Sequence, residues 1–272
     1  MYSGTTFTKA SGIILGAHQK IDRLAYHNFS VLLKDKTTFP TIKQILHFEG
    51  YNGPDAIKRK SPSKDEPWHF FIPSDENDTH LLSVISSHYD RLVVSLREHD
   101  LVRAAFEGAW LAHAIVDGLT PAHHYPYGDK LAELKGKRHV SARTLKDKLL
   151  FPGATLTKSL VNNWKFWGPK GLFMTHASFE MGVATLIRPI KLTFSECVGE
   201  LPQDVTSLNL SNWFRTIAQQ IDSYKMYDEF YAHGWNRSLA KRIRNDLLPV
   251  IVGSIILVWK GAASEAGLVL LD

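Results

Sequence analysis

The sequence predicts a single all-helical domain. Apolar residues recur at spacings of three and four in several segments, which is typical of amphipathic helices. No segment alternates apolar and polar residues over the length of a strand. The 272 residues are 44% hydrophobic, enough for a sizeable core, and no repeat or low-complexity linker divides them. We therefore expect residues 1–272 to form one all-α domain.

The N-terminal half contains four expected helices joined by polar segments. The stretch Ala56–Pro67 is rich in Lys, Ser and Pro, which indicates a surface loop. Trp68-His69-Phe70-Phe71 follows it and indicates that the chain re-enters the core. The helices are expected over Gly16–Leu33, from Phe39-Pro40-Thr41 to His47, from a cap at Asp78 or Thr79 to Arg97, and from about Leu101 to Gly118.

The C-terminal half begins with the highly charged segment Gly128–Lys148, expected to be a solvated loop and a short helix. The apolar run Leu247–Trp259 is shorter than the roughly 20 residues that span a bilayer, so we expect a buried closing helix and no transmembrane segment. Helices are expected over Thr157–Trp167, Leu172–Ile187, Ser211 to Tyr231 or beyond, and Leu239–Trp259.

Charge and cysteine content narrow the classes of partner and site. The net charge of +5 suits an anionic partner such as phosphate, nucleic acid or an acidic membrane surface. Cys197 is the only cysteine, so an intrachain disulfide and a cysteine-based zinc site are both excluded. The apolar group Ile13-Ile14-Leu15 is shorter than the about 7–15 residues of a signal-peptide core, so a cytoplasmic location is expected for the sequence as given.

The stretch Trp110–His124 carries three histidines and an aspartate at the end of an apolar helix. His113 and Asp117 are four residues apart and project from one helix face, where both can reach one ion. Gly118 and Pro121 then end the helix and allow His123 to return to the same space. This pattern predicts a metal site.

A single His-x-x-x-Asp pair is weak evidence, because 13 His and 27 acidic residues give about one such pair by chance. His18 and Asp22 form another pair, which we do not interpret as a joint site. The prediction rests instead on the order and spacing of a larger set. Its members are His18, Asp55, His69, His113, Asp117, His123, His176 and Glu180, with Asp65 as an alternative to Asp55.

This ordered set resembles the bacterial zinc-dependent phospholipase C family, whose relatives include fungal single-strand-specific nucleases. The resemblance spans Gly16 to Glu180. It implies an all-helical fold with three zinc ions in a cleft. The blocks that carry it are Gly16-Ala-His18-Gln-Lys-Ile-Asp-Arg-Leu-Ala25, Gly53-Pro-Asp55, Trp68-His69-Phe70, Leu111-Ala-His113-Ala-Ile-Val-Asp117-Gly-Leu-Thr-Pro121-Ala-His123 and Thr175-His176-Ala-Ser-Phe-Glu180.

The resemblance also implies how the ligands are distributed among the zinc ions. One zinc would be held by Asp55, His69, His113 and Asp117, and a second by His123, His176 and Glu180. A third would use His18, with Asp117 as a bridge. The family completes that third site with an N-terminal Trp freed by processing, whereas this sequence starts at Met1 and its first Trp is Trp68. We therefore expect two or three zinc ions.

The expected activity is zinc-dependent hydrolysis of a phosphodiester, of phospholipase C type, with Asp55 orienting or deprotonating the attacking water. A single-strand nuclease or nucleotidase on the same site is the alternative within the enzyme class. A metal-binding or membrane-associated protein without catalysis is the alternative outside it. The partners are accordingly a phospholipid or other phosphodiester, with nucleic acid as the alternative substrate. Trp164 and Trp167 are interpreted as core or semi-buried residues, or else, together with Phe166, as a contact for a membrane or a base.

Overall fold

The computed structural model describes residues 16–49, 52–55, 70–126, 130, 133–134 and 150–271. Within these ranges the chain is predominantly helical and forms no β-strand; an isolated bridge pairs Leu33 with Leu270. The all-α prediction is confirmed for this part of the chain. The main helices are α1 (Ala17–Phe29), α2 (Ile42–Glu49), α4 (His80–Arg97), α5 (Leu101–Gly118), α8 (Leu156–Trp167), α9 (Leu172–Ile187), α11 (Leu210–Ser223), α12 (Met226–His233) and α14 (Leu248–Glu265).

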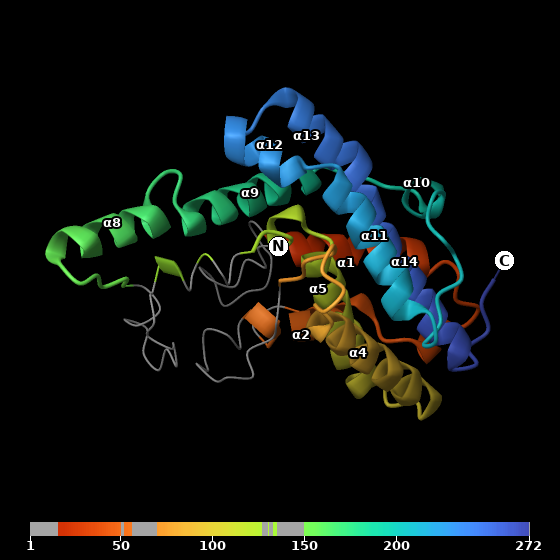
Figure 1. The fold of residues 1–272 in the computed structure, drawn as a ribbon. Helices are drawn as coiled ribbons and strands as arrows, with labels where there is room; N and C mark the ends of the chain where they lie inside the picture. Colours follow the sequence, from red (N-terminus) through yellow and green to blue (C-terminus); the bar gives the residue numbers. More distant parts are fainter. Residues whose placement is uncertain are drawn as a thin grey trace.

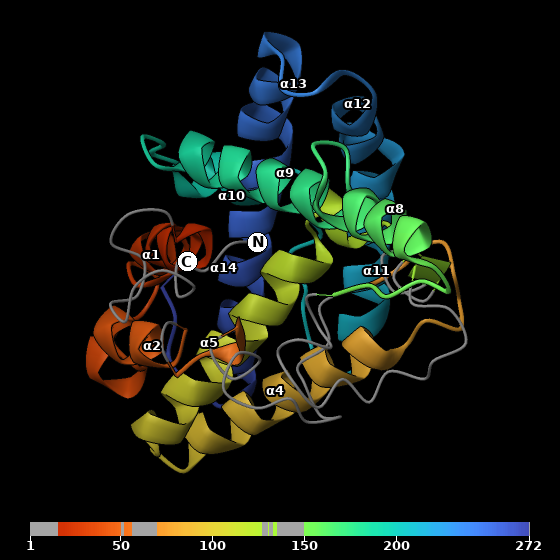
Figure 2. The same cartoon turned by 90° about the vertical axis from the view of Figure 1, so that its left-hand side faces the viewer.

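The core is built around α14, which packs against α1, α4, α5 and the short helix α10 (Phe194–Val198). Helices α4 and α5 lie side by side as a pair (Figures 1 and 2). Trp259 of α14 is completely buried and is the largest fully buried side chain among the described residues. Its indole nitrogen donates to the carbonyl of Gly108 at 3.2 Å, which fastens α14 to α5.

The closing helix is longer than the apolar run suggested. Helix α13 (Arg237–Arg242) continues through a π turn (Ile243–Leu247) into α14, and Pro249 lies in the first turn of α14. Proline has no backbone N–H and is tolerated at that position, so it does not end the helix. The run Arg237–Glu265 is long and apolar enough to cross a membrane by length and composition, yet 78% of its most apolar window is buried inside the protein.

The expected helix from Ser211 to Tyr231 is in fact two helices. The chain breaks between α11 and α12 at Lys225, whose φ of 50° lies in the left-handed region. Few non-glycine residues adopt that region, and the sequence contains no Gly or Pro there to signal a break. Spacing alone therefore could not separate these helices.

The second predicted helix continues two residues beyond its expected end, to Glu49, which is fully buried. The first is shorter than expected, because it ends at Phe29. Helix α10 was not predicted, although Thr193 and Glu196 form a capping box at its start. The predicted loop Ala56–Pro67 lies outside the described residues, as does most of Gly128–Lys148.

Candidate metal centre

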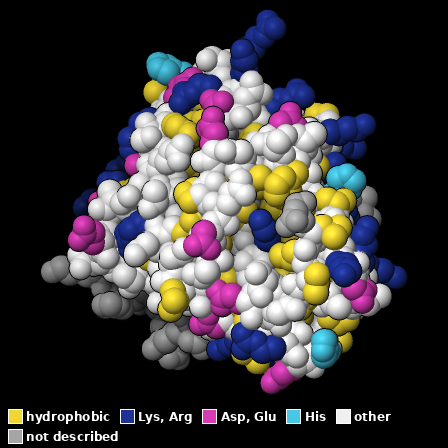
Figure 3. Space-filling view, turned by 90° about the vertical axis from the view of Figure 1, so that its right-hand side faces the viewer, with side chains coloured by type: hydrophobic (Ala, Val, Ile, Leu, Met, Phe, Trp, Pro, Cys, Tyr) yellow, Lys and Arg dark blue, Asp and Glu magenta, His cyan; other side chains and the backbone are white. Residues whose placement is uncertain are grey.

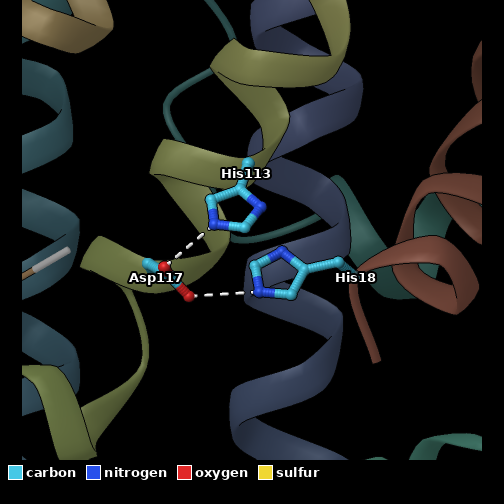
Figure 4. Close-up of side chains that lie close together, drawn as sticks. All are labelled: His18, His113 and Asp117. Atoms are coloured by element: carbon cyan, nitrogen blue, oxygen red, sulfur yellow. Dashed lines mark ion pairs between the residues drawn. The ribbon is translucent and has the colours of Figure 1, made fainter. Parts of the chain in front are cut away.

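The first group of candidate ligands lies where α1 meets the end of α5. His113 and Asp117 project from one face of α5, and His113 Nε2 lies 3.2 Å from Asp117 Oδ2. His18, in the first turn of α1, stacks on His113 with 4.0 Å between ring centroids, and its Nε2 lies 3.2 Å from Asp117 Oδ1. The two oxygens of Asp117 therefore face two different imidazoles (Figure 4).

The chain turns sharply after Asp117, as the sequence predicted. Gly118 ends α5, and its φ is not positive, so it is not needed for a left-handed turn. A Cβ at this position would lie 2.5 Å from Leu81 and 2.6 Å from Phe214, so glycine is required for close packing instead. A 3-10 turn (Pro121–His123) then brings His123 Nδ1 to 3.8 Å from Asp117 Oδ1.

The second group joins that turn to α9. His123 Nε2 lies 2.8 Å from Glu180 Oε1, and His176 Nε2 lies 3.0 Å from the same oxygen. The two imidazoles are stacked, with 5.0 Å between ring centroids. His176 and Glu180 are one turn apart on α9, which repeats the arrangement of His113 and Asp117 on α5.

Both groups have the composition and geometry of a metal site. The ligand atoms of His18, His113 and Asp117 all lie within 4.8 Å of one another, and so do those of His123, His176 and Glu180. The two groups could thus hold metal ions, and they meet at Asp117. Imidazole nitrogen and carboxylate oxygen are ligands that zinc accepts, whereas magnesium prefers more oxygens.

The division of these ligands among separate ions stays a prediction. His18, which the resemblance assigns to a third ion bridged by Asp117, lies in one group with His113 and Asp117, and the two histidines face different oxygens of Asp117. Asp55 lies at the edge of this group, with Oδ1 3.8 Å from His113 Nε2. His69 lies outside the described residues, as does Asp65, the alternative to Asp55.

The surroundings shift the pKa values of His123 and His113 in opposite directions. Burial lowers the pKa of His123 to about 4, although the charge of Asp117 opposes this effect. Burial alone would raise the pKa of Glu180, but His176 and His123 hold it well below its usual range. For His113 burial acts to lower the pKa, but the charges of Glu49 and Asp117 raise it well above its usual value. A neutral imidazole and an ionised carboxylate are the forms that bind metal, so His123 and Glu180 are ready to do so.

Access to solvent increases across the site. The side chains of His18, His113, Asp117 and His123 are almost fully buried. Those of His176 and Glu180 are 13% exposed, and that of Asp55 is 26% exposed. Among the described residues, the exposure of the candidate ligands is therefore greatest at Asp55, His176 and Glu180.

Glu49, at the end of α2, is the residue that sequence reasoning missed. It is fully buried, and its Oε1 lies 2.9 Å from His113 Nδ1 and 3.5 Å from His18 Nδ1. A carboxylate on the far nitrogen of an imidazole fixes the ring orientation and the tautomer that presents Nε2 to a metal. The sequence did contain a signal, because Glu49 follows Ile42 and Ile45 at spacings of three and four and so interrupts an apolar row.

We predict that Glu49→Gln weakens zinc binding about 10–100-fold, the usual effect of losing such a supporting carboxylate. Competition with a chromophoric chelator measures the affinity directly. Glu107→Gln is the matched control, because Glu107 is equally buried and also contacts a histidine, but that histidine, His88, belongs to neither ligand group. Equal affinities for Glu49→Gln and the parent chain would show that Glu49 only fills space.

His124, directly after His123, faces away from the ligand groups. Its Nε2 lies 2.9 Å from the carbonyl of Gly118 and its Nδ1 lies 3.6 Å from Asp222. His123 and His124 are therefore neighbours in the sequence but have different surroundings, so the effects of replacing each one can be compared.

Comparisons of the chain with protein-family models, with curated proteins and with solved structures found no match. The geometry of the two ligand groups is therefore the basis for the functional argument.

Proposed function

We propose that this chain is a zinc-dependent phosphodiester hydrolase of phospholipase C type. The observation that carries the proposal is the position of Asp117 between two groups of candidate ligands. One of its oxygens lies 3.2 Å from His113, and the other lies 3.2 Å from His18 and 3.8 Å from His123. A carboxylate in this position can serve ions held by both groups, and hydrolysis of phosphate esters commonly uses such paired metals.

Zinc bound at these groups would lower the pKa of water to about 7 and stabilise the attacking and leaving oxygens of a phosphodiester. Each group supplies three protein ligands, which leaves a position for water or substrate. Asp55 is the most exposed of the described carboxylates at the site, so it is suited to orient or deprotonate the attacking water. Cys197 is not needed as a nucleophile: burial, aided by Glu196, raises its pKa to about 12, so it remains a thiol at neutral pH.

The proposal predicts that chelated protein regains hydrolysis when zinc is restored. We expect bound zinc of two or more ions per chain, and zinc-dependent release from an aryl phosphodiester and from phosphatidylcholine. His123→Ala should lose both zinc and turnover. His124→Ala is the matched control and should keep both, because this neighbour is also buried but faces Gly118 and Asp222.

The same assay distinguishes the alternatives. Release from single-stranded DNA without release from phosphatidylcholine would identify a nuclease, a reading favoured by the exposed indole of Trp164, on which a base could stack. Stoichiometric zinc with no turnover on any of these substrates would identify a metal-binding protein without catalysis. Absence of bound zinc would overturn the proposal itself.

A further inference from the structure

Helix α8 exposes an apolar row along its length. Leu156, Leu160 and Trp164 recur every four residues, and their side chains are 86%, 73% and 69% exposed. Residues at this spacing share one helix face, so the three form a continuous stripe. Soluble proteins rarely leave such contiguous apolar surface uncovered unless it binds a partner.

This stripe lies on a helix that is held firmly in place. Phe166 is buried and packs on Phe151, with 4.3 Å between ring centroids, and on Phe173 of α9 at 5.6 Å. Asn163 exchanges hydrogen bonds with both backbone groups of Phe151, at 3.2 and 3.0 Å. The expectation that Trp164 is a core residue is therefore wrong, whereas Phe166 is the residue that anchors α8.

Helix α8 also lies at the edge of the molecule. It projects from the remaining helices on the left of Figure 1, the side that faces the viewer in Figure 2, and α9 is its main contact among the described helices. The apolar surface continues onto Phe173 and Met174 in the first turn of α9. The next residues on α9 include His176, so the stripe is continuous with the helix that carries the second ligand group.

The charge around the stripe indicates the chemistry of its partner. At 3.6 residues per turn, Lys158 and Lys165 lie about 100–180° around the helix axis from the three residues of the stripe, on the polar side of α8. The sequence from Leu150 to Phe179 contains three lysines, the third being Lys170, and no Asp or Glu. On the opposite side of the molecule, apolar side chains lie among charges of both signs (Figure 3). An apolar stripe with Trp and Leu, on a helix whose only charged residues are lysines on its other side, is typical of a helix that lies in the surface of an anionic bilayer.

We propose that α8 is a docking helix that inserts Leu156, Leu160 and Trp164 into the surface of an anionic lipid bilayer. Lys158 and Lys165, on the polar side of the helix, then lie toward the lipid headgroups and water, and Trp164 lies at the headgroup level, where amphipathic rings are favoured. This surface is separate from the two ligand groups. The proposal therefore holds whether or not the chain hydrolyses phosphodiesters.

Vesicle flotation tests the docking surface. We expect the full chain to float with vesicles of phosphatidylserine and phosphatidylcholine in equal amounts, and more weakly with phosphatidylcholine alone. Replacing Leu160 and Trp164 together by Ser should lower the partition constant at least about tenfold, because burying one leucine-sized side chain accounts for that factor. Lys158→Gln and Lys165→Gln should each lower binding to the anionic vesicles by about fivefold.

Leu208→Ser is the matched control, because Leu208 is 96% exposed but lies outside the stripe. It should leave binding unchanged, and so should His123→Ala, which separates docking from hydrolysis. The proposal is overturned if the full chain does not float, or if the Leu160 and Trp164 variant floats as well as the parent. It is also overturned if that variant instead abolishes self-association or binding of single-stranded DNA while vesicle binding persists.

Discussion

Asp117→Asn is expected to remove at least one zinc ion per chain and to reduce turnover by more than the roughly 10–100-fold cost of losing a supporting carboxylate. The physical reason is that both oxygens of Asp117 face imidazoles, at 3.2 Å from His113 and 3.2 Å from His18. An amide has nearly the same shape but carries no negative charge and only one acceptor oxygen. The substitution thus removes the shared ligand while it leaves the helix intact.

Metal analysis after dialysis, together with the aryl phosphodiester assay, measures both effects. Asp22→Asn is the matched control. Asp22 is also buried on α1, but it belongs to neither ligand group. Burial and the charge of Glu49 raise its pKa well above the usual value, so its carboxyl resembles a neutral amide. Full zinc content and full turnover in Asp117→Asn would refute the shared role of this carboxylate.

Trp259→Ala is expected to lower the free energy of unfolding by about 3–5 kcal/mol, the usual cost of removing a buried tryptophan. The indole is completely buried, with its centroid 6.0 Å from that of Phe29 and 6.1 Å from that of Phe39. Its removal leaves a cavity among α1, α5 and α14, and it leaves the carbonyl of Gly108 without the indole donor. Because native proteins are stable by only about 5–15 kcal/mol, this loss is a large fraction of the total.

Urea unfolding followed by circular dichroism measures the change. Trp164→Ala is the control for the same substitution at an exposed site, and it should change the free energy of unfolding by less than about 0.5 kcal/mol. A destabilisation of similar size in both variants would contradict the burial that distinguishes these two tryptophans.

Much of the helical content could be predicted from local spacing. The helices α4, α5, α8 and α9 begin and end within a few residues of their expected bounds, because each has an amphipathic or apolar pattern with polar residues or Gly and Pro at its ends. The break at Lys225 could not be predicted in this way, since lysine is not a residue type that signals the left-handed conformation it adopts there. The burial of Glu49 could not be predicted either, because it depends on which helix packs against α2.

The features of the candidate site can likewise be divided into those that the sequence predicted and those that only the structure revealed. Residue type and spacing alone were enough to single out His113 with Asp117 and His176 with Glu180, because a helix places residues four apart on one face. Only the tertiary structure decided that His18 stacks on His113, that Glu49 supports both rings, and that Asp117 lies between the two groups. These contacts join α1, α2, α5 and α9. How those helices meet is determined by the packing of their shared core, and no local sequence pattern encodes that packing.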